Sequence, residues 1–111
     1  MDVEILARYF QILASPTRLA VIRLLSEGRR DVKDLCARVA VPQSNMSNHL
    51  ACLRWCGLVR ATRIGRRQFY ELNDSNVAVA IEEFASSVIW PDLAVQLKTC
   101  RRLSSPGAEG L

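Results

Sequence analysis

The spacing of apolar residues changes twice along this 111-residue chain, and those changes limit the folds available to it. From Val3 to about Cys56 the apolar residues recur every three or four positions, which is the period of helices packed on a core. After Gly57 come two short segments containing β-formers, and helical spacing returns from about Val77. The pattern predicts a mainly helical domain with one β-hairpin.

Helix start and stop signals predict four helices before the hairpin. An amphipathic helix over 3–13 comes first, and Ser15-Pro16 supplies the N-cap and first-turn proline of a second helix, which ends at Gly28. Asp31 caps a third helix, and Pro42 opens a fourth. The second helix has too many apolar side chains for a surface element, so we expect it in the core.

The hairpin is expected over 58–64 and 68–72, with a basic turn at 65–67. The polar residues 73–75 then cap a long last helix, which Pro91 kinks or restarts. The expected order is α-α-α-α-β-β-α. Helices three and four with their short turn form a helix-turn-helix, and the hairpin behind them is a wing, so the predicted fold is a winged helix-turn-helix.

The length allows one domain, which we place at 1–103, followed by a flexible Ser-, Pro- and Gly-containing tail at 104–111. No apolar run reaches the roughly 20 residues that span a bilayer. The amino-terminal segment does not resemble a secretion signal, so we expect a cytoplasmic protein whose four cysteines are reduced and available as ligands.

The charge and the fourth helix both indicate a nucleic-acid partner. Fifteen Lys and Arg against eleven Asp and Glu give a net charge of +4, which favours a polyanion. The fourth helix has one apolar stripe, Met46, Leu50 and Leu53, and is otherwise rich in amide and hydroxyl groups suited to base edges and phosphates. A merely solvated face is the alternative. The candidate DNA-contacting residues of this helix are Gln43, Ser44, Asn45, Ser47, Asn48 and His49.

Three stretches, ASPTR at 14–18, SNMSNHL at 44–50 and LRWCGLV at 53–59, resemble the ArsR/SmtB family of metal-responsive repressors, and the resemblance extends over roughly 6–88. It implies a homodimer, built on the first and last helices, that binds an inverted-repeat operator in its apo form and releases it when an inducing ion binds. It also places the polar residues of the fourth helix at the DNA.

The same resemblance places three wing arginines at the DNA backbone or minor groove. They are Arg63, Arg66 and Arg67.

Two of the four cysteines lie on the fourth helix. Cys52 and Cys56 are one helical turn apart, outside the apolar stripe, so both thiolates can reach one soft ion. Cys36 falls on the inner side of the third helix, where a packed core thiol is the favoured interpretation.

The two cysteines and their neighbours are similar to those of the cadmium- and lead-sensing members of the family. That similarity implies a third thiolate from near the carboxyl terminus, for which Cys100 is the candidate, from the same protomer or, as the similarity suggests, from the partner. An exposed, unused thiol is the alternative. Three sulfur ligands favour Cd(II), Pb(II), As(III) or Sb(III).

Other ion sites found in this family have no counterpart here. With a single histidine, His49, the chain lacks the paired His and Asp sites of the zinc sensors. Asp31 and Lys33 occupy the positions of the Cys-x-Cys motif that some arsenic sensors have on the third helix.

Three other classes of function are the alternatives to an ion-responsive repressor. A dimeric winged helix that has lost DNA binding, and a repressor controlled by thiol oxidation, both stay open, although two cysteines one turn apart on a helix have poor geometry for a disulfide. An enzyme is disfavoured because no phosphate loop, Cys-His pair or carboxylate dyad is present. Trp55, on the outward side of the fourth helix, has no assigned role.

Overall fold

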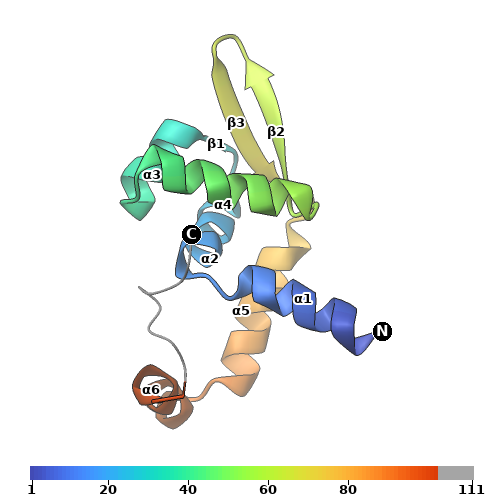
Figure 1. The fold of residues 1–111 in the computed structure, drawn as a ribbon, viewed down its shortest axis with the longest axis vertical. Coiled ribbons are helices and arrows are strands. Elements are labelled where there is room, and N and C mark those ends of the chain that lie inside the picture. The colour runs from blue at the N-terminus through green and yellow to red at the C-terminus, as the bar shows by residue number, and fades with distance from the viewer. Residues whose placement is uncertain (103–111) are drawn as a thin grey trace.

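The computed structural model describes residues 1–102 and shows a helical body from which a two-stranded ribbon projects (Figure 1). The helices are α1 (Val3–Leu13), α2 (Pro16–Leu25), α3 (Val32–Val39), α4 (Gln43–Trp55), α5 (Asn76–Val88) and α6 (Pro91–Thr99). The strands are β1 (Arg30–Asp31), β2 (Val59–Ile64) and β3 (Arg67–Leu72). The expected tail at 104–111 lies outside the described residues.

The helix starts follow the capping residues that the sequence predicted. The Ser15 hydroxyl accepts a hydrogen bond from the Arg18 backbone N–H at 3.2 Å, and Pro16 occupies the first turn of α2. The Asp31 carboxylate accepts from the Asp34 N–H at 2.8 Å at the start of α3. These side chains satisfy backbone donors that the first helical turn leaves without a partner.

The core lies between α2, α3, α4 and the base of the hairpin. From α2 it takes Val21, Ile22 and Leu25, which confirms the expected central position of that helix. The apolar stripe of α4 faces the same core. The other buried apolar residues are Leu35, Leu58, Val59, Tyr70, Leu72 and Ala78.

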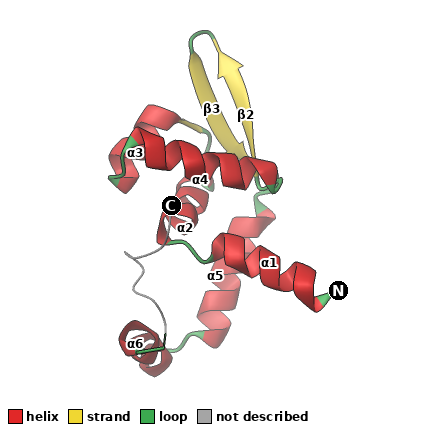
Figure 2. Ribbon diagram, viewed as in Figure 1, coloured by secondary structure: helices red, strands yellow, loops and turns green. Residues whose placement is uncertain are grey.

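The hairpin is a regular antiparallel ribbon that projects from the helices on the side of α4 opposite to α5 (Figure 2). Val59 pairs with Leu72 at its base and Ile64 with Arg67 at its tip. Gly65 in the turn has φ 63°, a left-handed conformation that suits glycine. The predicted wing is therefore confirmed. Each of its strands begins one residue away from the expected position and ends where expected.

Two elements are added to the expected order. The short strand β1 pairs with β3, Arg30 opposite Tyr70 and Asp31 opposite Phe69, so the sheet order is β1-β3-β2. Two residues are too few to show a strand period in the sequence. After α5 the chain restarts as α6 at Pro91. None of the helices within residues 1–102 has the length and apolar character needed to cross a membrane.

Candidate DNA-binding surface and thiol pair

The helix α4 turns one face to the core and leaves a polar face at the surface. Gln43, Ser44, Ser47 and Asn48 are exposed, and Asn45 is half-buried. Five of the six polar residues predicted on this helix therefore lie where an external ligand could reach them. Their contact with DNA stays a prediction.

His49 is the exception, and our expectation that it lies at the DNA was wrong. Its side chain is 1% exposed, and its Nδ1 lies 3.2 Å from the Arg18 Nη1. Because His49 comes three residues after Met46 and four before Leu53, the helical period places it beside the apolar stripe. The polar contact with Arg18 lowers the free-energy cost of burying the imidazole there.

The three wing arginines differ in their contacts. The Arg63 Nε donates to the Gly65 carbonyl at 3.4 Å, and Arg66 is exposed in the turn. Arg67 forms an ion pair with Asp31, with its Nε 2.8 Å from the Oδ2, and lies 5.1 Å from the centre of the Phe69 ring. Arg67 thus attaches the wing to the start of α3 in addition to any contact with DNA.

We expect replacement of Asp31 by asparagine to lower the melting temperature by a few degrees at neutral pH. The backbone N–H of Asp34 and the Arg67 guanidinium hold the pKa of Asp31 below its ordinary value of 3.8. A pKa lowered by folding means that the carboxylate contributes stability above about pH 4, and that this contribution is lost as the pH falls through the lowered value.

Thermal melts of both proteins between pH 7 and pH 3 check this prediction. The gap between the variant and the wild type should close as the medium becomes acidic. Asp92→Asn, in the first turn of α6, is the control and should melt like the wild type. A gap of constant size from pH 7 to pH 3 would contradict the role assigned to the charge of Asp31.

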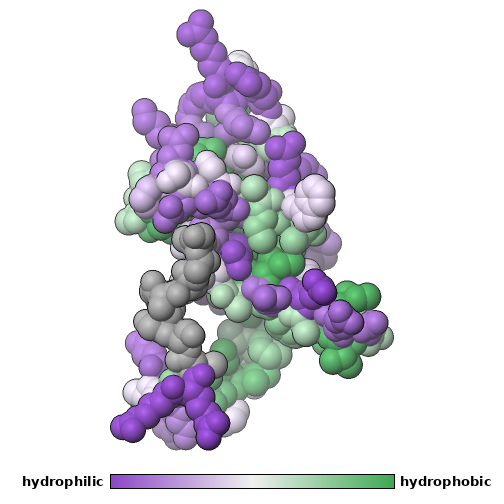
Figure 3. Space-filling view, viewed as in Figure 1, coloured by the Kyte–Doolittle hydropathy of each residue, from purple (hydrophilic) through white to green (hydrophobic). Residues whose placement is uncertain are grey.

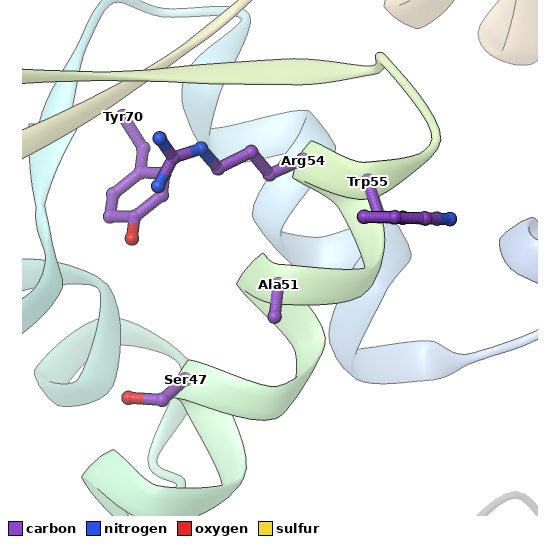
Figure 4. Close-up of a pocket in the computed structure, with 5 residues that line it drawn as sticks. All are labelled: Ser47, Ala51, Arg54, Trp55 and Tyr70. Atoms are coloured by element: carbon purple, nitrogen blue, oxygen red, sulfur yellow. The ribbon is translucent and has the colours of Figure 1, made fainter.

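A pocket of about 480 Å³ opens between α4 and the wing (Figure 4). Ser47, Ala51 and Arg54 line it from α4, and Tyr70 lines it from β3. Trp55 of α4 completes the lining. In Figure 4 the Arg54 side chain extends toward Tyr70, whereas the ring of Trp55 points away from Tyr70. Arg54 lies seven residues, about two helical turns, after Ser47, so the period of the polar face could have predicted it.

Cys52, in the last turn of α4, and Cys56, at its C-cap, are called the thiol pair below. Cys52 is half-buried and Cys56 is exposed. Burial raises the pKa of the Cys56 thiol and the adjacent Cys52 thiol raises it further, while the charge of Arg18 acts in the opposite direction. The effect of Cys52 on the Cys56 pKa is consistent with two thiols one helical turn apart on the same side of α4.

The other two cysteines lie apart from this pair. Cys100 is exposed at the end of α6, and within residues 1–102 no three His, Cys, Asp or Glu side chains come together as an ion site. Cys100 is therefore not beside the thiol pair in this structure of one protomer. Cys36 is half-buried and packs on the core from α3, as expected.

A wide apolar groove of about 1190 Å³ runs between α1 and α5 and extends to α6. Figure 3 shows apolar side chains gathered where α1 and α5 meet, while the wing end is mainly hydrophilic. Phe10 of α1 and Phe84 of α5 face each other in it, with ring centres 6.5 Å apart, and both rings are about half exposed. Apolar side chains that are exposed and gathered in one groove are typical of an interaction surface. Other apolar residues of the groove are Leu6, Tyr9, Leu13, Leu19, Val77, Ala80, Ile81, Ile89 and Leu97.

Comparison with known proteins identifies the family. Residues 15–61 match the model of the bacterial regulatory protein, arsR family. The HTH-type transcriptional regulator CmtR of Mycobacterium tuberculosis (strain ATCC 25618 / H37Rv) is 44% identical over 87 residues, which cover 78% of this chain and 74% of that protein. The chain belongs to the arsR family. It is therefore a transcriptional regulator and not an enzyme.

Two further comparisons extend over more of the chain or show the fold directly. A probable mercury resistance operon repressor of Streptomyces lividans is 32% identical over 103 residues, 93% of this chain and 81% of that protein. The solution structure of a homodimeric winged helix-turn-helix DNA-binding domain of Mycobacterium bovis superposes with a TM-score of 0.69 at 30% identity, over 77% of this chain and 82% of that one. The winged helix-turn-helix fold is thereby confirmed.

Proposed function

We propose that this arsR-family regulator binds an inverted-repeat operator as a homodimer and releases it when a thiophilic ion binds its cysteine thiolates. The observation that carries the proposal is the position of the thiol pair, at the end of the helix whose polar face would contact the bases. Binding at Cys52 and Cys56 would act directly on α4. The ions considered are Cd(II), Pb(II), As(III) and Sb(III), and the site of action is the reducing cytoplasm.

The DNA-binding half of the proposal rests on the surface formed by α4 and the wing. The exposed amides and hydroxyls of α4 suit base edges, and the arginines at the wing tip suit phosphates. Arg54 lines the pocket between α4 and the wing together with Ser47, and we propose it as a further phosphate contact.

The ion-binding half rests on the chemistry of the donor set. Two free thiols one helical turn apart, one half-buried and one exposed, offer a soft ion two sulfur ligands from the same side of α4. Cys100, exposed at the end of α6, is our candidate for the third ligand, supplied by the same or the partner protomer. Such a site would supply charge and rigidity at the end of α4, not catalysis.

The homodimer is supported by the apolar groove. The groove joins the first helix to the last long helix, which are the elements predicted to form the dimer, and the similar Mycobacterium bovis domain is homodimeric. A second copy would cover apolar area that the protomer leaves exposed.

Fluorescence anisotropy of labelled promoter DNA with reduced protein tests this function. We expect nanomolar-range binding and, on addition of one soft ion, a loss of affinity of about 100-fold. Hg(II) joins the four ions because of the named role of the Streptomyces relative, and Zn(II) serves as the harder comparison ion. Tight binding indifferent to every ion would disprove ion sensing, and absence of DNA binding would favour a dimeric interaction protein.

The salt dependence of operator affinity should show whether the wing arginines contact DNA phosphates. Replacing Arg63 and Arg66 together by glutamine is expected to make the plot of log affinity against log salt less steep by about 0.9 for each phosphate that the wing no longer neutralises. Arg23→Gln on α2, an exposed arginine away from the wing, is the matched control and should keep the wild-type slope. Equal slopes for all three proteins would show that the wing does not touch the DNA backbone.

A further inference from the structure

Two arginines from different parts of the chain lie over the same aromatic ring. The guanidinium carbon of Arg29, just before β1, lies 5.3 Å from the centre of the Phe69 ring, and that of Arg67 on β3 lies 5.1 Å from it. Both distances are within the roughly 6 Å at which a cation is attracted to an aromatic face. These three residues are called the arginine stack below.

The sheet fixes the position of this stack. Phe69 and Arg67 are two residues apart on β3, so their side chains stand on one face of the sheet, and Asp31 of β1 is the partner of Phe69 in the pairing. The Asp31 carboxylate forms an ion pair with Arg67 and also caps α3. The arginine stack is therefore held where β1, β3 and the start of α3 meet, near the base of the wing (Figure 1).

Arg29 is the member of the stack whose charge is not neutralised by a carboxylate. Its side chain is exposed, and within residues 1–102 it contacts the Phe69 ring but forms no ion pair. Arg67 is already paired with Asp31, and Arg30 is paired with Asp34. A guanidinium that lies with one face on a ring keeps the N–H groups along its edge available to an anion.

The place of the stack in the fold indicates which anion it meets. In a helix-turn-helix the first helix crosses the DNA backbone while the second lies in the major groove. Here α3 is the first helix and α4 the second, and the arginine stack lies at the start of α3. Docking of α4 in the groove is therefore expected to bring the edge of Arg29 to the DNA backbone.

We propose that Arg29 binds a backbone phosphodiester of the operator and that Phe69 is the residue that positions it. The inference rests on the DNA-binding half of the proposed function. It extends the contact surface beyond α4 and the wing tip to the segment that precedes α3.

The ring prepares the arginine for this contact. A long side chain loses rotamer freedom when it binds, and the contact with Phe69 orders Arg29 before DNA arrives. The planar fork can then donate two parallel hydrogen bonds to two oxygens of one phosphate. Loss of the ring should therefore weaken the same contact that loss of the arginine removes.

The salt dependence of operator affinity counts the phosphates that Arg29 neutralises. A dimer carries two copies of Arg29, so Arg29→Gln should make the plot of log affinity against log salt less steep by about 1.8. Between about 50 and 200 mM salt the wild type should then lose about tenfold more affinity than the variant. Arg23→Gln, an exposed arginine of α2 that pairs with Glu82, is the control and should keep the wild-type slope.

A second measurement locates the contact on the DNA. Operator duplexes that carry an uncharged methylphosphonate in place of one backbone phosphate at a time are bound by each protein. We expect one position in each half-site at which the wild type loses roughly fivefold in affinity and Arg29→Gln loses nothing. Phe69→Leu, which keeps an apolar side chain without an aromatic face, should show a smaller loss there than the wild type. Thermal melts establish that each variant is folded.

The possible results separate this inference from the proposed function. Equal salt slopes for the wild type and Arg29→Gln, with the same methylphosphonates impairing both, would overturn the Arg29 contact and leave operator binding intact. A folded Phe69→Leu that responds to every methylphosphonate as the wild type does would overturn the positioning role of the ring. A wild-type protein that does not bind the operator at any salt concentration would overturn the proposed function together with this inference.

Discussion

Serine in place of Cys52 or Cys56 is expected to abolish ion-dependent release of the operator while the apo variant binds DNA within a few-fold of wild type. A serine hydroxyl stays protonated and is a hard oxygen donor, so a soft ion loses one of its two adjacent sulfur ligands. The response should fall from about 100-fold to nearly none. DNA binding itself should persist because neither sulfur is required to fold α4, whose core contacts come from the apolar stripe.

The other two cysteines supply the control and the test of the third ligand. Cys36→Ser, on the core side of α3, should keep the full response, since that thiol lies apart from the pair. Cys100→Ser should weaken ion binding and the response if Cys100 is a ligand. A mixture of Cys52→Ser and Cys100→Ser proteins, in which mixed dimers form, distinguishes ligation within one protomer from ligation across the dimer. Release by Cys52→Ser at wild-type ion concentrations would disprove ion sensing at the thiol pair.

Replacing Phe84 by glutamate is expected to separate the dimer and to lower operator affinity by roughly 10²–10⁴-fold, the gain that a linked second half-site provides. Phe84 is 55% exposed in the protomer and lies in the apolar groove opposite Phe10. A buried carboxylate without a partner opposes association, whereas the protomer can leave it in water. The fold of the single chain should therefore persist.

Sedimentation and the anisotropy assay together measure this effect. The conservative variant Phe84→Leu keeps an apolar side chain at the same position and should stay dimeric, with near wild-type DNA affinity. Circular dichroism shows that both variants retain their helices. A Phe84→Glu protein that sediments as a dimer and binds the operator normally would show that the groove between α1 and α5 is not the dimer interface.

Much of the site could be predicted because it depends on local spacing. The caps at Ser15 and Asp31 act within one helical turn, and the thiol pair follows from two cysteines four residues apart. The exposed face of α4 follows from the position of its apolar stripe. The same reasoning could have found Arg54, which lies about two helical turns after Ser47 on that face.

Where prediction was wrong or silent, the missing information was a partner far away in the sequence. His49 has the polarity of a surface residue, yet a contact with Arg18, 31 residues earlier, allows it to be buried. Arg67 was expected to serve the DNA, and its pairing with Asp31 joins residues 36 apart. The spacing of apolar residues in one segment does not indicate which distant residue that segment will contact. That spacing shows which face of a helix or strand is apolar, but not which polar side chains will pair.

The winged helix-turn-helix, the polar face of α4 and the placement of Cys52 and Cys56 on one side of that helix could be predicted from the sequence, because each depends on helical or strand period and on capping within a few residues. The contacts of Arg18 that join α1 to α4, and the attachment of the wing by β1 and Asp31, became visible only in the folded chain. Those contacts form when packing brings distant segments together, and hydrogen-bond geometry then selects the partners.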